Sequence, residues 1–389
     1  YKRQMTHRSS TSSMAPSSRW PKVKRWLRGS EAVRSSVQPS SSSVTVRMGG
    51  GAVSLMPARW PRCTLEAISA PENLLRASRR ARRGKSRRPD VEAWWLRRES
   101  AILRLSAELA EGSWSPSGYR FFEIHDPKRR TIAAAPFGDR VVHHALCLLL
   151  EPVLARRFIA RSFSCQVGKG TTAARACCRQ LVNHHRYVLK CDVRKFFPSL
   201  DHAVLLEKLG ALVRCPGALD LCRRLIASHR TPERERPCGL PIGNLTSQLW
   251  GNFYLDAMDH ALTEQERHGA YLRYTDDFLL FGDDKARLWT LRDRVVAELA
   301  AGHLELAIPK SRLLACREGV PFCGFLFRPS LAPRILGATK RRHEGRGHRL
   351  RAAGDFPRLS ETTRSWYQFS REGNSEGLRR AWSRPRSAG

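Results

Sequence analysis

Three aspartates stand among strand-forming apolar residues in two separate segments of the chain. Asp192 interrupts the apolar run of YVLKCDVRKFF, and Asp276 and Asp277 close the run YLRYTDD. Burying a carboxylate is costly unless it is paired with a cation or bound to a metal ion. Taken alone, residues 274–277 are also compatible with an ordinary hairpin turn, because Asp favours turns. Taken with Asp192, they indicate a cluster of carboxylates on two adjacent strands.

Such a cluster suits nucleotidyl transfer assisted by two divalent metal ions. One Mg²⁺ lowers the pKa of a primer 3′-hydroxyl, and a second stabilises the triphosphate and the leaving pyrophosphate. The two ions lie about 3.5–4 Å apart and need oxygen ligands on both sides. Carboxylates from neighbouring strands can supply these ligands. The sequence therefore predicts a centre with two Mg²⁺ ions, for which Mn²⁺ is a candidate substitute.

The elements that must position these residues alternate between strands and helices. A β-hairpin is expected where Phe121, Phe122 and Ile124 alternate before a turn, with residues 128–130 at its tip. Further strand-like runs are expected at 187–200, 271–281 and 320–327. Helix-like segments are expected at 139–160, 203–228, 246–264 and 285–302. Because the connections are of mixed type, we expect an α+β fold rather than a doubly wound sheet.

The composition narrows the class of partner. Lys and Arg number 69 against 35 Asp and Glu, a formal charge of +34, which makes nucleic acid the first candidate partner and an anionic membrane surface the second. No run of eighteen apolar residues occurs, so we expect no membrane span. The 11 cysteines contain no CxxC pair, which argues against a disulfide framework or a zinc site. A reducing, cytoplasmic location fits these features.

The N-terminal part of the chain differs from the rest. Residues 1–62 are rich in Ser and Arg and have no helical or strand period, and ordered structure is expected from Pro71, so residues 1–70 are assigned as a disordered segment. A transit peptide, a fragment boundary and translation upstream of the natural start are alternatives for residues 1–62. The basic run at 79–88 adjoins a helical period over 91–110, which indicates a phosphate-contacting surface.

From about residue 72 to about residue 383, the ordered motifs resemble the reverse transcriptase family. Asp192 falls on the aspartate of the family's first palm strand, and the segment from Tyr274 to Asp277 falls on its YxDD box. The resemblance is greatest to the branch found in diversity-generating retroelements. It implies a right-hand polymerase fold with fingers, a palm built on a ferredoxin-like (RRM-like) antiparallel sheet, and a helical thumb.

The resemblance also divides the chain and assigns its metal ligands. Residues 71–330 would form the fingers and palm, and residues 331–389 a basic helical thumb and tail. Gly345, Gly347 and Gly354 predict a thumb helix that is shorter or less ordered than is typical. The metal ligands implied by the family pattern are Asp192, Val193, Asp276 and Asp277.

Further roles follow position by position from the same resemblance. Phe197 matches the aromatic gate that excludes the ribose 2′-hydroxyl, although a core aromatic is the alternative. Arg130 matches the triphosphate-binding arginine, with Lys128 as a second contact, although hairpin-tip cations are often only solvated. Lys310, in LAIPKSRLL, matches a lysine that could protonate pyrophosphate, against the alternative of a surface lysine. Tyr274 is assigned to the nucleotide site, and GVPFCGF at 319–325 resembles the primer grip.

The segment before the helix at 246–264 separates this chain from most of the family. Where most members carry QGxxxSP, this chain reads Ile242-Gly243-Asn244-Leu245-Thr246-Ser247-Gln248. Ile242, Gly243 and Gln248 are expected to face the incoming nucleotide. Replacing the usual Gln by Ile242 removes a polar contact and implies error-prone synthesis opposite template adenine. The alternative is that Ile242 only packs, with normal fidelity.

The resemblance thus implies an RNA-directed DNA polymerase of a diversity-generating retroelement, which uses template RNA, a DNA or RNA primer and deoxynucleoside triphosphates. A small basic accessory protein is an expected partner, and no membrane is involved. The alternatives are a defence-associated or intron-type reverse transcriptase, a template-dependent RNA polymerase, and a non-catalytic RNA-binding scaffold. The presence of all three carboxylates argues against the scaffold.

Overall fold

The computed structural model describes residues 63–125, 129–232 and 234–383. The segment 1–62, for which we predicted disorder, lies outside the described residues, and so does Lys128 at the hairpin tip. In the described ranges, no helix is long and apolar enough to cross a membrane.

The described chain opens with four helices, which are α1 (Leu65–Ser69), α2 (Pro71–Arg82), α3 (Pro89–Leu96) and α4 (Arg98–Ala110). Helix α1 corrects the prediction that ordered structure begins at Pro71. The Thr64 hydroxyl caps α1 by accepting a 3.1 Å hydrogen bond from the Ala67 amide, and Ile68 is fully buried. A helix of five residues is too short to show a period in the sequence.

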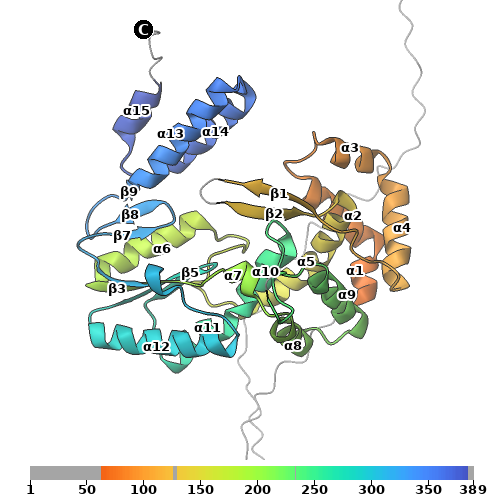
Figure 1. Ribbon diagram of the computed structural model, residues 1–389, viewed down its shortest axis with the longest axis horizontal. Coiled ribbons are helices and arrows are strands. Elements are labelled where there is room, and N and C mark those ends of the chain that lie inside the picture. Colours follow the sequence, from red (N-terminus) through yellow and green to blue (C-terminus); the bar gives the residue numbers. More distant parts are fainter. Residues whose placement is uncertain (1–62, 126–128, 233, 384–389) are drawn as a thin grey trace, which may run out of the picture. The chain divides into compact units, whose positions relative to one another are not determined.

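The expected β-hairpin is present. Strands β1 (Arg120–Ile124) and β2 (Arg130–Ala134) pair in antiparallel register, with Ile124 opposite Arg130. All five side chains of β1 are exposed, whereas β2 is partly covered. The chain then enters the long helix α5 (Phe137–Arg157), which packs against α2. The hairpin thus projects a basic end from a helical base (Figure 1).

The central sheet has four antiparallel strands in the order β4-β5-β3-β6, which are β3 (Tyr187–Asp192), β4 (Tyr271–Tyr274), β5 (Asp277–Gly282) and β6 (Arg312–Ala315). Helices connect β3 to β4, and helix α12 (Lys285–Ala301) connects β5 to β6. A β-α-β-β-α-β chain with this order has the ferredoxin-like arrangement. The expected α+β class and antiparallel palm sheet are confirmed.

The connection from β3 to β4 holds α7 (Phe196–Ser199), α8 (His202–Leu212), α9 (Pro216–Ala227), α10 (Leu245–Tyr254), α11 (Asp256–His260) and the π-helical turn η1 (Ala261–Gln265).

The strand predicted over 187–200 is too long, because Lys195 takes a left-handed φ of 43° and starts α7. The helix predicted over 203–228 is two helices, since Pro216 begins α9 and disfavours helix in the residue before it.

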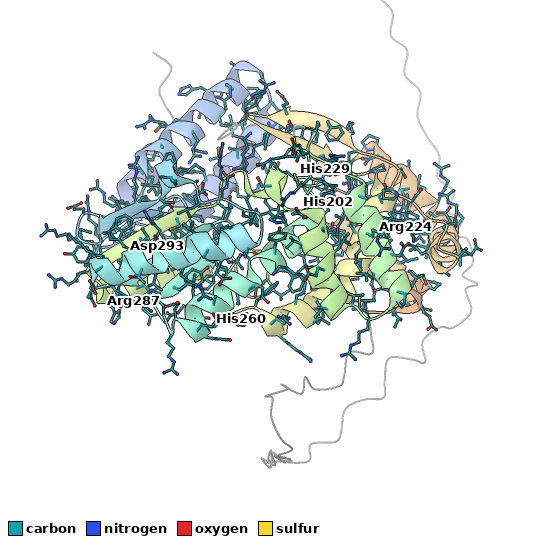
Figure 2. The ribbon with its side chains drawn as sticks, turned by 60° about the horizontal axis from the view of Figure 1, so that its bottom comes forward. His202, Arg224, His229, His260, Arg287 and Asp293 are labelled. Atoms are coloured by element: carbon teal, nitrogen blue, oxygen red, sulfur yellow. The ribbon has the colours of Figure 1, made fainter. Side chains whose placement is uncertain are left out.

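Alternate residues of the central strands face two different cores. Leu189 and Cys191 of β3 belong to the core that includes residues of α10 and α12, whereas Val188 belongs to the core that includes α6 (Thr171–His184). Helix α12 covers one sheet face, and its Arg287 and Asp293 side chains keep 43% and 69% exposure (Figure 2). Because both faces of the sheet are covered, a charged side chain inside these strands needs a polar partner.

The C-terminal part combines a three-stranded sheet with three helices, which are β7 (Val320–Phe322), β8 (Phe325–Phe327), β9 (Arg334–Ile335), α13 (Gly337–Ala352), α14 (Phe356–Ser370) and α15 (Glu376–Ser383). Gly345 and Gly347 lie inside α13, and Gly354, with a φ of 64°, lies just beyond its end. His343 of α13 stacks on Trp366 of α14 with ring centroids 4.2 Å apart. This packing outweighs the weak helix propensity of two glycines.

Candidate active site

The strand register brings the three predicted aspartates to one edge of the sheet. Asp192, the last residue of β3, pairs directly with Asp277, the first residue of β5. Asp276 precedes Asp277 in the turn after β4. The Asp276 carbonyl accepts a 3.3 Å hydrogen bond from the Val193 amide. Residues 84 or more positions apart in the chain thus meet because β3 and β5 are adjacent and antiparallel.

Val193 lies at the same edge, in an isolated bridge with Leu306. The bonds that flank this bridge run from the Ala307 amide to the Asp192 carbonyl and from the Arg194 amide to the Glu305 carbonyl, each at 2.8 Å. These bonds leave the Val193 carbonyl outside the pairing. That carbonyl is the one oxygen through which Val193 could contribute to a metal site.

Two lysines contact the aspartates. Lys310, which ends the short helix η2 (Ile308–Lys310), forms an ion pair with Asp192. Lys190, on β3, lies 2.8 Å from each carboxylate oxygen of Asp277 and donates a hydrogen bond to Oδ2. Sequence reasoning singled out Lys310 but missed Lys190, although a lysine inside the apolar run YVLKCD was an available signal.

The electrostatics of the site disfavour full ionisation of its carboxyls. Burial, and then the neighbouring charge of Asp192, raise the pKa of Asp276 to about 6, while Arg130 acts in the opposite direction. Burial also raises the pKa of Asp277 above its usual value, against the lowering effect of Lys190. Crowded, buried carboxylates of this kind are stabilised in their charged form by an added cation.

The residues present fit a magnesium site. As they stand, no three His, Cys, Asp or Glu side chains in the described ranges are close enough together to hold a metal ion. The Oδ1 atom of Asp277 is nevertheless buried and accepts no hydrogen bond of good geometry, although the Lys190 ammonium lies 2.8 Å away, and the available donors are carboxylate and carbonyl oxygens, which Mg²⁺ prefers. Release of Asp192 from Lys310 would free a further carboxylate for such a site.

Phe197 lies beside this edge, in helix α7 rather than in a strand. Its ring centroid is 5.2 Å from that of Phe196, which is buried, whereas Phe197 is only half-buried. Both rings pack against Gly251 of α10, where an added Cβ would lie 3.1 Å from Phe196 and 3.3 Å from Phe197. The placement suits a sugar gate, and the role of Phe197 stays a prediction.

The loop before α10 contacts the β-hairpin. The Ile242 carbonyl accepts a 3.1 Å hydrogen bond from the Ala133 amide of β2, and the Ile242 side chain is half-buried. Gly243 has a φ of 118°, and an added Cβ there would lie 3.1 Å from Ile132. Gln248 is exposed on α10. The segment therefore connects the hairpin with helix α10. A loop that faces the nascent base pair would need such a position. The roles of Ile242, Gly243 and Gln248 at the nucleotide stay predictions.

The basic end of the hairpin contains two arginines in different states. Arg129 is held by Glu123 through hydrogen bonds of 2.7–2.9 Å. Arg130 is exposed, and its charge is the smallest of the influences on the pKa of Asp276, which it lowers. The role of Arg130 as a triphosphate contact stays a prediction.

Residues 319–325, which resemble the primer grip, form the tight hairpin of β7 and β8. Gly319 and Gly324 have φ values of 114° and 87°, and an added Cβ would come within 2.9 Å of Leu326 at the first and within 2.9 Å of Phe369 at the second. Lys190 donates a 3.1 Å hydrogen bond to the Pro321 carbonyl. The same lysine thus ties this hairpin to Asp277.

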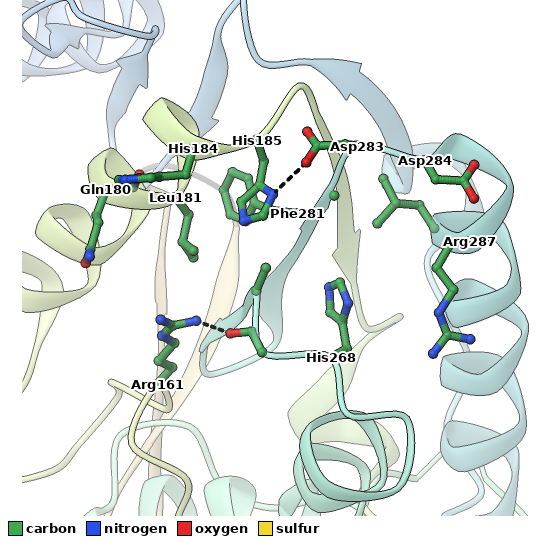
Figure 3. Close-up of a pocket in the computed structure, with 14 residues that line it drawn as sticks. Arg161, Gln180, Leu181, His184, His185, His268, Phe281, Asp283, Asp284 and Arg287 are labelled. Carbon is green, nitrogen blue, oxygen red and sulfur yellow. Dashed lines mark hydrogen bonds and ion pairs between the residues drawn. The ribbon is translucent and has the colours of Figure 1, made fainter.

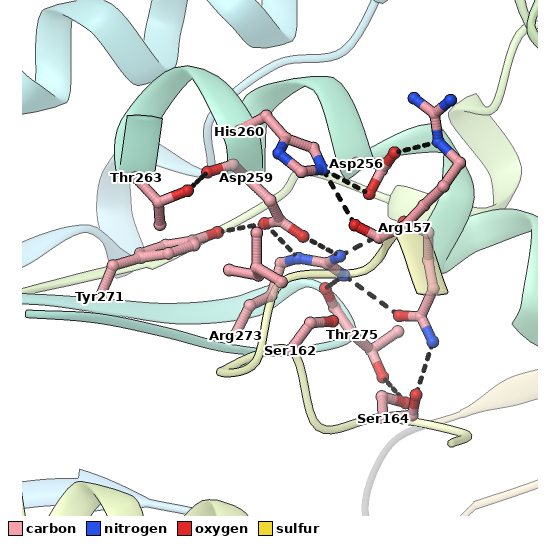
Figure 4. A network of polar contacts seen from close by, with 12 residues as sticks. Arg157, Ser162, Ser164, Asp256, Asp259, His260, Thr263, Tyr271, Arg273 and Thr275 are labelled. Atoms are coloured by element: carbon pink, nitrogen blue, oxygen red, sulfur yellow. Dashed lines mark hydrogen bonds and ion pairs between the residues drawn. The ribbon is translucent and has the colours of Figure 1, made fainter. Parts of the chain in front are cut away.

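A buried polar network supports the turn that carries Asp276 (Figure 4). Its centre is an ion pair between Arg273 of β4 and Asp259 of α11, and both side chains are 0% exposed. Tyr274, which follows Arg273, is half-buried and packs against the core that includes α6. Sequence reasoning missed Arg273 and Asp259, although an arginine within the run YLRY was unusual for a buried strand.

A separate cavity lies at the opposite end of β5, near Phe281 and Gly282 (Figure 3). His185 forms a 3.5 Å ion pair with Asp283 there, and burial lowers the pKa of His268 to about 4. The lining contains none of the three aspartates. This cavity therefore does not belong to the candidate active site.

Comparison with known proteins agrees with the site. The family described as "Reverse transcriptase (RNA-dependent DNA polymerase)" matches residues 125–327, which is more than half of the chain. The matched region begins at the β-hairpin, includes all three aspartates, and ends with β8. The chain belongs to the reverse transcriptase family.

Individual relatives are more distant. The chain is 22% identical over 169 residues to the putative COX1/OXI3 intron 1 protein of Saccharomyces cerevisiae, covering 42% of this chain and 20% of that protein. A match to the intron 2 protein of the same yeast has 22% identity over 171 residues and the same shares. The chain thus spans about a fifth of the length of these relatives.

A solved structure of telomerase from Candida albicans, in complex with a TWJ fragment of telomeric RNA, is 13% identical with a TM-score of 0.44. The match covers 58% of this chain and 46% of the telomerase chain. At this level of likeness we draw no conclusion from it about function.

Proposed function

We propose that this chain is an RNA-directed DNA polymerase that extends a primer along an RNA template with deoxynucleoside triphosphates. The observation that carries the proposal is the meeting of Asp192, Asp276 and Asp277 at one edge of a ferredoxin-like sheet in a reverse transcriptase family member. These carboxylates and the Val193 carbonyl would hold two Mg²⁺ ions, or Mn²⁺ in their place. When bound, the ions activate the primer hydroxyl and stabilise the triphosphate.

Lys310 has two successive tasks in this proposal. Before a metal binds, its ammonium neutralises Asp192, which lowers the cost of holding several carboxylates together. The Lys310 side chain is 53% exposed in this ion pair, and once released its ammonium would bear a proton that it can donate to departing pyrophosphate. Its flexible stem allows both positions.

Phe197 and Arg130 would select and hold the incoming nucleotide. A half-buried ring five residues after Asp192 in the chain could occupy the space that a ribose 2′-hydroxyl would need. The exposed guanidinium of Arg130, projected on the hairpin, can form charge-assisted hydrogen bonds to phosphate oxygens. Lys128 is proposed as a second phosphate contact.

The charge of +34 suits a template–primer duplex, because Lys and Arg that neutralise phosphates release counterions and strengthen binding. We assign the basic helix α13 to the surface that binds this duplex. Its basic residues include Lys340, Arg341, Arg342, Arg346 and Arg349. A small basic accessory protein, if one assists, would be expected to act on the RNA rather than on this already basic chain.

Primer extension with the full chain tests the proposal. An RNA template, a DNA primer, deoxynucleotides and Mg²⁺ should yield complementary DNA, and Asp276→Asn should reduce synthesis by orders of magnitude. Asp293→Asn, on the exposed side of α12, is the matched control and should leave synthesis unchanged. Absence of wild-type synthesis would reject the polymerase proposal and favour an RNA-binding scaffold, whereas near-normal synthesis by Asp276→Asn would reject the assigned metal site.

Two biological roles are compatible with this activity. The similarity to proteins named for introns favours an intron-type reverse transcriptase, and this is the role that we propose first. Ile242, which stands where most of the family has Gln, supports the second candidate, an error-prone enzyme of a diversity-generating retroelement. The half-buried Ile242 side chain offers no polar group to a base.

Fidelity separates the two roles. Loss of one polar contact to the nascent base pair would remove roughly 1–3 kcal/mol of discrimination, which is about 10- to 200-fold in misincorporation. Sequencing complementary DNA made by the wild-type chain and by Ile242→Gln measures this effect. Errors concentrated opposite template adenine in the wild type, and reduced in Ile242→Gln, would favour the retroelement. An even and low error rate would favour the intron-type role.

A further inference from the structure

The arginine that precedes the YTDD segment is fully buried and donates five hydrogen bonds. Arg273 donates through Nε to Asp259 Oδ1 at 2.7 Å and through Nη2 to Asp259 Oδ2 at 2.5 Å. Its other hydrogen bonds reach the Asn252 side chain at 3.1 Å, the Asn252 carbonyl at 3.3 Å and the Thr275 carbonyl at 3.0 Å. A guanidinium has five N–H donors, and the five bonds account for all of them.

The contact with Thr275 is the one that reaches the catalytic turn. Thr275 has a φ of 59°, a left-handed conformation that is unfavourable for a β-branched residue. Such a conformation persists only when its surroundings hold it. Arg273 binds the Thr275 carbonyl, and Ser164 holds the Thr275 hydroxyl at 2.7 Å, so both sides of this residue are fixed. The next residue in the chain is Asp276.

The same hydrogen-bond network reaches helix α10, which follows the loop proposed to face the nucleotide. Asn252 lies on α10, the helix that follows the Ile242–Gly243 loop, and its side-chain amide donates a 2.6 Å hydrogen bond to the Ser164 carbonyl. Arg273 and Ser164 therefore each bond both α10 and the turn (Figure 4). A shift of α10 would be transmitted to the turn before Asp276 through these hydrogen bonds.

We propose that Arg273 is a positioning residue that holds Thr275 in its left-handed conformation and thereby aims Asp276 at the metal-binding edge, with Asp259 as its buried counter-ion. This inference rests on the proposed polymerase function, and it extends that function to residues that contact neither metal nor nucleotide. Asp259 also accepts a 2.7 Å hydrogen bond from the Tyr271 hydroxyl, so the counter-ion is itself fixed.

Stability alone does not account for this arrangement. Replacing both members of a buried ion pair by apolar side chains of similar volume is often neutral or stabilising, whereas removing one member is strongly destabilising. An apolar pair would fill the same space between β4 and α11. It would not donate a hydrogen bond to the Thr275 carbonyl, and this is the contact that the proposal requires.

The test uses the full chain with Arg273→Met, Asp259→Leu and Tyr271→Phe combined. This triple variant removes the buried charges and the hydroxyl that would lose its acceptor, so it should stay folded, with a melting temperature lowered only by the lost bonds to Asn252 and Thr275. Mn²⁺ binding, followed by electron paramagnetic resonance without nucleic acid, should weaken by about ten-fold. In primer extension, kcat should fall on the order of 100-fold with little change in the KM for deoxynucleotides, because a displaced ligand harms the chemical step.

Arg273→Lys provides the second variant in case the triple variant does not fold. Lysine keeps the positive charge beside Asp259 but lacks the fork that reaches Asn252 and Thr275 together. It should fold and still bind Mn²⁺ more weakly. The control is Arg294→Met with Glu298→Leu, a 2.7 Å ion pair on α12 away from the turn, which should leave Mn²⁺ binding unchanged.

Wild-type Mn²⁺ affinity and kcat in a folded triple variant or a folded Arg273→Lys variant would overturn the proposal and leave the ion pair a purely structural role. If the wild-type chain extends no primer, the polymerase proposal fails on its own. The Mn²⁺ titration still tests the positioning role in that case, because it requires no catalysis.

Discussion

Replacing Lys190 by Met should destabilise the protein and abolish synthesis in one step. The Lys190 ammonium lies 2.8 Å from Asp277 Oδ2 and 3.1 Å from the Pro321 carbonyl, and Met retains only the apolar stem. Breaking a buried ion pair costs about 3–5 kcal/mol. Because the two side chains keep 20% and 29% exposure, we expect the lower end, about 3 kcal/mol. For a chain of this size, that loss lowers the Tm by roughly 6 °C.

The destabilisation by Lys190→Met should depend on pH. Burial already raises the pKa of Asp277, and Lys190 is the first group that lowers it, so the variant should show a still higher pKa. A carboxyl with a raised pKa in the folded state binds its proton more tightly there than in the unfolded chain, so acidification relieves the cost of its buried charge. In Mg²⁺-free buffer, the Tm difference from wild type should therefore shrink between pH 7 and pH 5.

Calorimetric scans at the two pH values, together with primer extension, measure both effects. Lys285→Met is the control, because the Lys285 ammonium lies 4.8 Å from the Tyr187 ring centroid and contacts no carboxylate of the site. A Tm loss that is equal at both pH values, or a Lys190→Met variant with wild-type synthesis, would refute the assigned role of Lys190.

Three further predictions concern the nucleotide and the metal ligands. Shortening Phe197 to Val should raise ribonucleotide incorporation relative to deoxynucleotides in single-nucleotide extension, and an unchanged ratio in a folded variant would make Phe197 a core aromatic. Arg130→Met should raise the KM for deoxynucleotides by about ten-fold. Arg129→Met, whose guanidinium is already bound to Glu123, should change that KM little, and equal effects would contradict the assignment. Because the pKa of Asp276 is about 6, synthesis at limiting Mg²⁺ should fall by about ten-fold from pH 7 to pH 5 as the carboxyl takes up a proton. A flat pH profile would show that Asp276 is not a ligand whose charge limits metal binding.

Local patterns in the sequence were sufficient for the elements closest to the chemistry. Asp192 and the pair Asp276–Asp277 stood out because carboxylates are rare inside apolar strands. The alternating residues of β1 and the turn that follows it predicted the hairpin. The motif around Lys310 led to a lysine that the structure places against Asp192. Each of these signals depends on residues close together in the chain.

Boundaries and partners depended on contacts between distant residues. The strand over 187–200 was predicted too long because Phe196 and Phe197 are equally apolar in a strand and in the short helix α7. Gly345 and Gly347 were expected to weaken the helix because their low propensity is visible in the sequence, whereas the stacking of His343 on Trp366, which packs α13 against α14, is not.

The sequence by itself determined that this chain carries the carboxylates, the basic charge and the motif order of a reverse transcriptase. Only the tertiary structure decided that Lys190 neutralises Asp277, that Arg273 and Asp259 are buried together, and that Thr275 is held in a left-handed turn. The physical reason is that a lone charge in a strand is unfavourable whatever its eventual partner. The sequence shows that such a charge requires a partner. Only the folded chain determines which distant side chain comes within hydrogen-bonding distance.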